Sequence, residues 1–354
     1  MDEQGPWLTV NLAAVVRNAR RFAEVVGVPL MPMVKANGYG LGAVAVARAL
    51  EVVEPWGYGV ATLAEAGALR AAGVARPVMA FWPLQPAWND QYRSVDVRPA
   101  IGDLRSLDAW IGEAAAPFHV EIDTGMGRSG FRWHDRETLA AVAGRLAGAP
   151  GFEGIFTHFA SADGSKDETE IQWARLMEIM AGYGLRPPLI HAANSGAGQW
   201  GGRFAGTLAR PGIFLYGGRS GLRVGEPTAT VTAQVIAVRP VRAGDPVSYE
   251  GTYRCSTDAD LVTIAIGYAD GVHRTLGNRG LVSIGGREYP IAGRVTMDMT
   301  MVVAEPGAVA LGQLATIIGG RVGLDAQAER AGTIGYELLT SIGPRVVRRY
   351  QEVE

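Results

Sequence analysis

Short apolar runs alternate with amphipathic stretches up to about residue 217. Apolar residues recur at helical spacing in residues 12–26, 44–52 and 172–180. About eight strand–helix repeats in roughly 210 residues favour a parallel sheet, and a (β/α)8 barrel fits that number. The runs with strand character are residues 8–10, 29–34, 57–61, 77–80, 95–100, 118–122, 154–157, 189–191 and 207–209.

The pattern changes after residue 216. Residues 217–226 are rich in Gly and Arg, and helical periodicity then disappears. We therefore predict an α/β protein with an N-terminal (β/α)8 TIM barrel over residues 8–225 and a mostly β C-terminal domain over residues 226–354. Gly, Pro and Asp turns separate the strands predicted in this second domain, at residues 228–238, 260–266, 281–284, 290–295 and 314–318.

Composition excludes several classes of protein. The 354 residues are 48% hydrophobic and 19% charged, which argues against global disorder. Lys and Arg total 33 against 35 Asp and Glu, so no basic field exists for nucleic acid. The N-terminus lacks a secretory signal pattern, and no apolar run reaches the ~20 residues that span a bilayer. We expect a cytoplasmic protein that binds neither nucleic acid nor membrane.

Cysteine and histidine usage argues against disulfides and metal sites. Cys255 is the single cysteine, so an intrachain disulfide and a cysteine-rich metal cage are both excluded. The five histidines are scattered without close pairing, and we predict no metal. Without a recognisable histidine partner, Cys255 is interpreted as a packed thiol.

The most informative segment is Met-Val-Lys-Ala-Asn-Gly-Tyr-Gly-Leu-Gly, residues 33–42. Lys35 directly follows an apolar strand, and barrel enzymes place their chemistry at that end of the strand. Partial desolvation there would lower its pKa and free the amine for a Schiff base. Two alternatives remain open from these residues alone. One is a solvated lysine in a glycine-rich turn, and the other is a G-x-G-x-x-A dinucleotide fingerprint over residues 38–43, which lacks the required acidic partner.

Further segments resemble the alanine racemase family, and they follow that family's order through most of the chain. The resemblance implies pyridoxal 5′-phosphate as cofactor, a barrel followed by a β domain, and a head-to-tail homodimer with shared active sites. It also implies that residues 1–7 pack with the β domain. The matching segments are residues 33–42, 123–128, 157–160, 191–195, 210–213, 266–271 and 293–298.

Racemisation requires a base on each face of a planar carbanion, because one base would return the proton to the side it left. The resemblance implies that Lys35 serves one face and that Tyr268 of the partner subunit serves the other. A phenol has a reference pKa near 10, so positive charge is needed to make phenolate accessible. Arg210, His191 and Arg128 are the candidates for supplying it.

The resemblance also assigns cofactor contacts. Arg210 matches the arginine that faces the pyridine nitrogen and, because arginine keeps its proton, would leave that nitrogen unprotonated. His158 matches the histidine packed against the cofactor ring. Ser195 is also a candidate helix N-cap. Phosphate binding is assigned to Tyr39, Ser195, Gly212, Ile213 and Tyr336.

Arg128 and the backbone amide of Met297 match the family's contacts to the substrate carboxylate, and Asp298 is interpreted as structural. Glu121 stands where many members carry a carbamylated lysine, which is also an anion. Our hypothesis is that Glu121 replaces the carbamate and orients Arg128 through a charge-assisted hydrogen bond. A solvated strand residue is the alternative for Glu121. Leu41 and Gly38 also depart from the family pattern.

The function implied is interconversion of L-alanine and D-alanine, which supplies D-alanine for peptidoglycan. A serine or broad-spectrum racemase on the same scaffold is the first alternative, because one hydroxyl changes discrimination only modestly. A non-enzymatic pyridoxal-phosphate carrier is the second, and residues 226–354 with Tyr268 argue against it.

Overall fold

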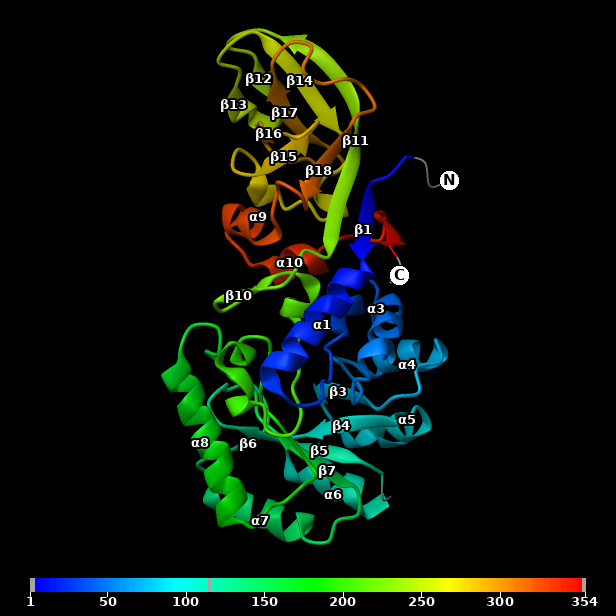
Figure 1. Ribbon diagram of the computed structural model, residues 1–354, viewed down its shortest axis with the longest axis vertical. Coiled ribbons are helices and arrows are strands. Elements are labelled where there is room, and N and C mark those ends of the chain that lie inside the picture. The colour runs from blue at the N-terminus through cyan, green and yellow to red at the C-terminus, as the bar shows by residue number, and fades with distance from the viewer. Residues whose placement is uncertain (1–3, 114–115, 352–354) are drawn as a thin grey trace.

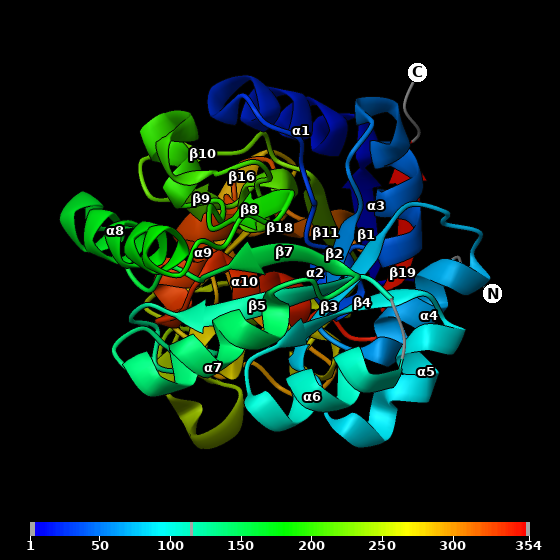
Figure 2. The ribbon, with the colours of Figure 1, turned by 90° about the horizontal axis from the view of Figure 1, so that it is seen from below.

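The computed structural model describes residues 4–113 and 116–351, and it has two parts (Figure 1). The lower part is a curled parallel sheet enclosed by helices, and the upper part is built mainly from antiparallel strands. Figure 2 views the lower part from below and shows the helices arranged outside the strands. The predicted α/β architecture, a barrel followed by a mostly β domain, is therefore confirmed. Within the described ranges, no helix is long and apolar enough to cross a membrane.

The barrel strands follow one another in sequence order, and each pairs in parallel with the next. Residues 30–33 and 206–211 close the ring through single bridges, Leu30 with Ala209 and Met33 with Gly59. The strands with regular ladders are β2 (Tyr58–Val60), β3 (Val78–Pro83), β4 (Val97–Ile101), β5 (Phe118–Asp123), β7 (Phe152–Phe156) and β8 (Leu189–His191), with β6 (Phe131–Arg132) beside β5.

Helices connect these strands, and local signals set their ends. The first, α1 (Leu12–Val26), begins where the Asn11 side chain accepts a hydrogen bond from the amide of Ala14, and it ends at Gly27 in the left-handed region. This matches the helix predicted over residues 12–26. The others on the outside of the barrel are α3 (Ala43–Leu50), α4 (Leu63–Ala71), α5 (Asn89–Ser94), α6 (Leu104–Glu113), α7 (Arg136–Leu146) and α8 (Lys166–Gly182).

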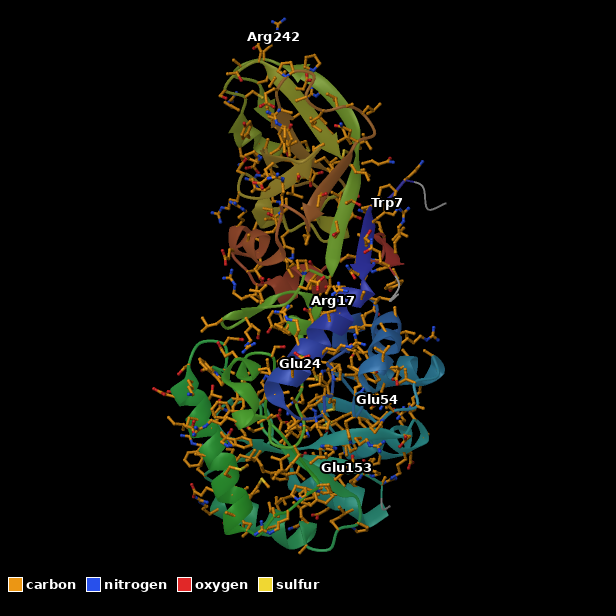
Figure 3. The ribbon with its side chains drawn as sticks, in the orientation of Figure 1. Trp7, Arg17, Glu24, Glu54, Glu153 and Arg242 are labelled. Atoms are coloured by element: carbon orange, nitrogen blue, oxygen red, sulfur yellow. The ribbon has the colours of Figure 1, made fainter. Side chains whose placement is uncertain are left out.

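The C-terminal sheet recruits both ends of the chain. The strand predicted at residues 8–10 forms as β1 (Trp7–Asn11), but it pairs with β11 and β19 rather than with the barrel. Trp7, labelled in Figure 3, thus belongs to this sheet, and of the residues 1–7 expected to pack with the β domain, residues 1–3 lie outside the described residues. The strands of this sheet are β11 (Ala229–Val241), β14 (Ala259–Ile264), β15 (Leu281–Ile284), β16 (Arg287–Pro290), β17 (Thr300–Ala304), β18 (Leu314–Ile318) and β19 (Val347–Gln351).

Two short hairpins accompany the sheet. The first lies at the change from barrel to β domain, before β11 begins at Ala229. The second lies in the β domain itself. They are formed by β9 (Arg219–Ser220) with β10 (Arg223–Val224), and by β12 (Pro246–Val247) with β13 (Tyr253–Arg254).

Two expectations for this domain were wrong. The strand predicted at residues 290–295 does not form, because Gly293 adopts a φ of 75° against the carbonyl of Val247 and turns the chain. We also predicted no helix in this domain because helical periodicity is lost after residue 226, but two form there, α9 (Leu324–Ala331) and α10 (Gly335–Thr340). Both are short, and α9 buries little beyond Gln327, Ala328 and Ala331, so their apolar pattern is weak.

A left-handed turn follows Lys35 and joins the two domains. Residues 36–40 all have positive φ, from 51° at Ala36 to 84° at Gly40. Left-handed backbone is costly for residues with a Cβ, so neighbouring structure must hold this turn. The ring of Tyr39 stacks on Tyr216 at 4.4 Å, and helix α10 lies directly against Gly40.

Replacing Gly40 by alanine is expected to destabilise the protein by about 2–4 kcal/mol, because left-handed strain adds to a steric clash. A Cβ at Gly40 would lie 2.2 Å from the carbonyl oxygen of Leu339. Gly27→Ala is the matched control, since Gly27 has a φ of 68° and nothing within 4 Å of an added Cβ. We expect it to cost about 1 kcal/mol. Denaturant unfolding compares the two, and equal losses would contradict the packing argument.

Candidate active site

A cavity of about 620 Å³, including its open mouth, lies where the barrel strands end beside α10. All eight residues predicted to bind the cofactor line it, together with Met33, Phe81 and Asn194, which were not predicted. These three lie in or just after predicted strands. They could have been predicted by assuming that the residues at the C-terminal end of every barrel strand face the mouth of the barrel. The lining residues are Met33, Lys35, Tyr39, Phe81, Arg128, His158, Asn194, Ser195, Arg210, Gly212, Ile213 and Tyr336.

Lys35 is half-buried at the start of the left-handed turn. Burial lowers the pKa of its amine, and the charges of Arg128 and Arg210 act in the same direction. The carboxylate of Glu65 opposes them only in part. The lysine amine is therefore more readily deprotonated here than in water, as a nucleophile or base requires.

Glu65 holds the backbone beside this lysine, and the sequence analysis missed it. Its carboxylate accepts hydrogen bonds from the amides of Ala36 and Ala61, both at 2.7 Å. The amide of Glu65 in turn donates to the side chain of Thr62 at the start of α4. A capping-box pattern, Thr-x-x-Glu, was visible in the sequence and would have placed Glu65 at a barrel loop.

Arg210 is buried at the back of the cavity with its hydrogen bonds almost fully used. Nη1 donates to Nδ1 and to the carbonyl oxygen of His191, at 2.6 and 2.5 Å. Nη2 donates to the carbonyl oxygens of Thr157 and Ala192, at 2.8 and 3.3 Å. Among the described residues, Nε has no hydrogen-bond partner. Because Arg210 lines the cavity, this N–H is available to a ligand atom that accepts one hydrogen bond.

Burial lowers the pKa of Arg210 to about 9, and the carboxylate of Glu121 counteracts part of that effect. Arg210 therefore remains a cation at neutral pH. The rings of Phe81 and Phe156 lie 5.6 and 5.4 Å from its guanidinium carbon, where cation–π attraction also favours the charge.

The other end of the cavity forms an anion cradle. The hydroxyl of Ser195 accepts from the amides of Gly212 and Phe214, at 2.8 and 3.3 Å, which leaves its own proton free to donate. Ser195 is not the N-cap of the turn η3 (Ala197–Phe204), because that position is Gly196 and has no side-chain cap, while the side chain of Asn194 accepts from the amide of Ala197. Ile213 begins the turn η4 (Ile213–Tyr216), whose first amides have no partner within the turn.

The cradle requires a glycine. A Cβ at Gly212 would lie 2.3 Å from the hydroxyl of Tyr39, so only glycine lets this phenol approach the backbone amides. Burial raises the pKa of Tyr39 and that of Tyr336, so both phenols keep their protons and can donate. The amides of Gly212 and Phe214 already donate to Ser195, so the amide of Ile213 is the one open to a ligand. This amide and the hydroxyl donors at one end, with a single guanidinium N–H at the other, fit the phosphate and the ring nitrogen of pyridoxal phosphate.

His158 lines the cavity between these two ends. Burial, with the charges of Arg210, Arg128 and Lys35, lowers the pKa of His158 to about 3. The imidazole is therefore neutral at physiological pH, which suits packing against an aromatic ring.

Glu121 is buried, and its hydrogen bond differs from the one expected with Arg128. Its carboxylate accepts a hydrogen bond from the hydroxyl of Ser129 at 2.7 Å, and in the described part of the chain it makes none with Arg128. The physical reason is position, because Arg128 is exposed at the cavity mouth while Glu121 lies beneath Gly130. Burial raises the pKa of Glu121, although the charges of Arg128 and Arg210 pull it down.

Tyr268 and Met297 do not line this cavity. They lie on the β domain with 43% and 53% of their surfaces exposed. Buried Asp270 holds the Tyr268 turn by accepting from the amide of Gly267 and from Nε of Arg345, both at 2.9 Å. Arg345 also donates to Asp298 at 2.8 Å. The structural role expected for Asp298 therefore corresponds to an ion pair that joins the two exposed loops.

Comparison with known proteins identifies the family. Residues 10–220 match the alanine racemase N-terminal domain, and residues 228–350 match the alanine racemase C-terminal domain. The chain belongs to the alanine racemase family. It is 35% identical to an alanine racemase from Acidiphilium cryptum, over 98% of this chain and 99% of that protein. It is 38% identical to one from Mycolicibacterium vanbaalenii, over 98% and 94%.

Solved structures of family members resemble the whole fold. Alanine racemase from Streptomyces lavendulae has a TM-score of 0.92 at 30% identity, covering 100% of this chain and 99% of that one. The enzyme from Bartonella henselae, solved with covalently bound pyridoxal phosphate, has a TM-score of 0.91 at 29% identity, covering 98% and 99%. The Bacillus anthracis enzyme with bound L-Ala-P has a TM-score of 0.91 at 32% identity, covering 99% and 96%.

Proposed function

We propose that the chain is a pyridoxal-phosphate-dependent alanine racemase that interconverts L-alanine and D-alanine with two bases. The observation that carries this proposal is the cavity itself. A partly desolvated lysine, an unpartnered arginine N–H and a hydroxyl-and-amide cradle meet there at the barrel mouth. Both domains of the alanine racemase family are present, which disfavours a carrier protein made of the barrel alone.

The cofactor, when bound, draws electrons away from the Cα–H bond of the amino acid. Lys35 would hold the cofactor through its aldehyde carbon, and its amine could take or deliver a proton on one face of Cα. Arg210 keeps its own proton at neutral pH and would donate one N–H to the ring nitrogen of the cofactor. Because arginine does not give up that proton, Arg210 would leave the ring nitrogen unprotonated, which would favour return of a proton to Cα.

The second base is assigned to Tyr268 of a partner subunit in a head-to-tail homodimer. In a single chain Tyr268 is partly exposed and lies outside the cavity, as a residue that serves a neighbouring chain would. Its turn is held rigidly through Asp270, so a partner would meet a preorganised phenol. Met297, on the loop joined to it through Asp298 and Arg345, would present its amide to the same site.

The substrate is a small amino acid, and alanine is favoured over serine because the relatives reported above are alanine racemases. D-alanine made in the cytoplasm would serve peptidoglycan synthesis. The test is direct: the purified chain with pyridoxal phosphate is offered L-alanine and L-serine separately, and the products are separated by chiral chromatography. We expect D-alanine to form much faster than D-serine. Equal rates would replace this proposal with a broad-spectrum racemase, and no inversion of either would reject it.

Replacing Glu121 by glutamine is expected to lower turnover about tenfold while cofactor content changes little. The Glu121 carboxylate raises the pKa of Arg210, so its loss lowers that pKa further. The alkaline limb of the pH profile, where activity falls as pH rises, should therefore shift to lower pH. Measuring kcat as a function of pH gives the size of this shift. Glu170→Gln, which removes a carboxylate paired with Arg203 on the barrel surface, is the control, and identical profiles for both variants would contradict the assignment.

A further inference from the structure

A line of buried side chains connects Arg210 with the opposite side of the barrel. Nδ1 of His191 lies 2.6 Å from Nη1 of Arg210, and Nε2 of His191 lies 2.8 Å from Nδ1 of His119. Nε2 of His119 lies 3.0 Å from a carboxylate oxygen of Glu153. Both histidines are fully buried, whereas 24% of the Glu153 side chain is exposed. Figure 3 labels Glu153 on the barrel, away from the β domain.

The chemistry at the two ends sets the direction of every hydrogen bond in this line. A guanidinium can only donate, so Nδ1 of His191 must be the unprotonated nitrogen. Its Nε2 then carries the proton and donates to Nδ1 of His119. Nε2 of His119 carries the next proton and donates to Glu153, since an ionised carboxylate can only accept. One tautomer of each neutral imidazole satisfies the whole line.

The surroundings keep both rings neutral and in place. Burial lowers the pKa of His119 and that of His191, and the charge of Arg210 acts in the same direction on each. Phe156 stacks on His191 at 4.9 Å, and Trp56 packs edge-on against His119. At Gly154 an added Cβ would lie 2.2 Å from Nδ1 of His119, so the neighbouring backbone also fits closely against this ring.

Glu153 is held as an anion at the far end. Burial raises the pKa of Glu153, but the hydrogen bond from His119 and the charge of Arg98 outweigh that effect and hold it below its usual value. Nε of Arg98 donates to Glu153 at 3.3 Å, and its Nη1 donates to Asp96 at 3.2 Å. The charged groups that face the line are thus Arg210, Glu153, Arg98 and, beyond it, Asp96.

We propose that Glu153 is a positioning residue for the reaction: through His119 and His191 it fixes the imidazole tautomer that accepts from Arg210, and so orients the guanidinium toward the cofactor ring. The inference rests on the proposed function for its catalytic consequence. Without an acceptor at Glu153, His119 can place its proton on Nδ1, which then faces the Nε2 proton of His191. Two N–H donors would then face each other. If His191 avoids this by moving its proton to Nδ1, that N–H faces the N–H of Arg210 instead. The guanidinium then loses an acceptor that holds Arg210 in place at the cavity.

Two variants distinguish the hydrogen-bond acceptor that Glu153 supplies from the negative charge that it carries. Glu153→Leu removes the acceptor, whereas Glu153→Gln keeps a carbonyl oxygen that can still accept from His119. Glu178→Gln is the matched control, because Glu178 forms an exposed ion pair with Arg136 on the barrel surface. We expect Glu153→Leu to lower kcat about tenfold with little change in KM, and Glu153→Gln to recover most of that loss. The control should retain wild-type kinetics.

The second measurement does not depend on turnover. Nitrogen NMR of the full-length protein labelled in its histidines distinguishes protonated from unprotonated ring nitrogens, with and without added cofactor. Five histidines are few enough to assign by substitution. At neutral pH, His119 and His191 should each be protonated at Nε2 alone in the wild type and in Glu153→Gln. Glu153→Leu should show protonation at Nδ1 as well.

Wild-type tautomers and kinetics in Glu153→Leu would overturn the proposal. So would an equal loss of kcat in both Glu153 variants with the histidine signals unchanged, because the effect would then bypass the two rings. A wild-type protein that racemises nothing would reject the proposed function instead, and the histidine signals would still decide whether Glu153 sets the tautomers.

Discussion

Replacing Lys35 by alanine is expected to abolish racemisation, with turnover lowered by at least about 10⁴-fold. The loss should exceed that of any other single substitution in the cavity because Lys35 would have two tasks. It binds the cofactor covalently, and it exchanges a proton with one face of Cα. No other amine borders this cavity among the residues described, so no neighbour can take over either task.

The sequence supplies a matched control. It contains two lysines, and the second, Lys166, is exposed at the start of α8 with its amine 6.0 Å from the ring of Trp200. Lys166→Met should leave turnover and cofactor binding unchanged. Lys35→Ala should lose both the covalent attachment and the activity, while far-ultraviolet circular dichroism confirms that each variant folds.

Chemical trapping identifies the lysine without relying on activity. Borohydride reduction of the loaded protein fixes the bond between cofactor and amine, and proteolysis followed by mass spectrometry locates it. With two lysines in the chain, the result is a choice between two peptides. A label on Lys166, or racemisation retained by Lys35→Ala, would contradict the assignment.

The sequence predicted the parts of this site that lie at the ends of periodic strands. Lys35 follows an apolar run directly, and the parallel arrangement of such runs brings Arg210 and Ser195 to the same mouth. Their roles came from resemblance to a family, since a lysine or serine at a strand end has many uses. The residues behind them were missed because His119 and Glu153 sit inside strands, where alternation indicates only burial.

Other features depend on contacts between segments distant in sequence. Strand β1 reads as the first strand of the barrel, yet it pairs with β11 and β19, more than 200 residues away. Periodicity gives the existence of a strand but not its partners. The same limit applies to Glu121: the resemblance suggested Arg128 as its partner, but its carboxylate accepts from the hydroxyl of Ser129.

Tyr268→Phe is expected to lower turnover about 10³-fold while leaving cofactor binding intact, because it removes a single acid–base group. The phenol is partly exposed, and its turn is held by backbone bonds and Asp270, so the substitution should not disturb folding. Equilibrium cofactor titration and stopped assays measure the two effects separately. Tyr249→Phe, at another exposed tyrosine of the β domain, should retain full activity. A Tyr268→Phe variant with wild-type turnover would remove the second base from the proposal.

Mixing subunits tests whether Tyr268 acts across a dimer. If each site takes Lys35 from one chain and Tyr268 from its partner, a mixed dimer of Lys35→Ala and Tyr268→Phe subunits contains one intact site. Random pairing of equal amounts makes half of the dimers mixed, so activity should recover to about one quarter of the wild-type value. Lys35→Ala mixed with the double variant should stay inactive, since neither chain then carries the lysine. If native mass spectrometry finds mixed dimers that are inactive, Tyr268 does not complete a neighbour's site.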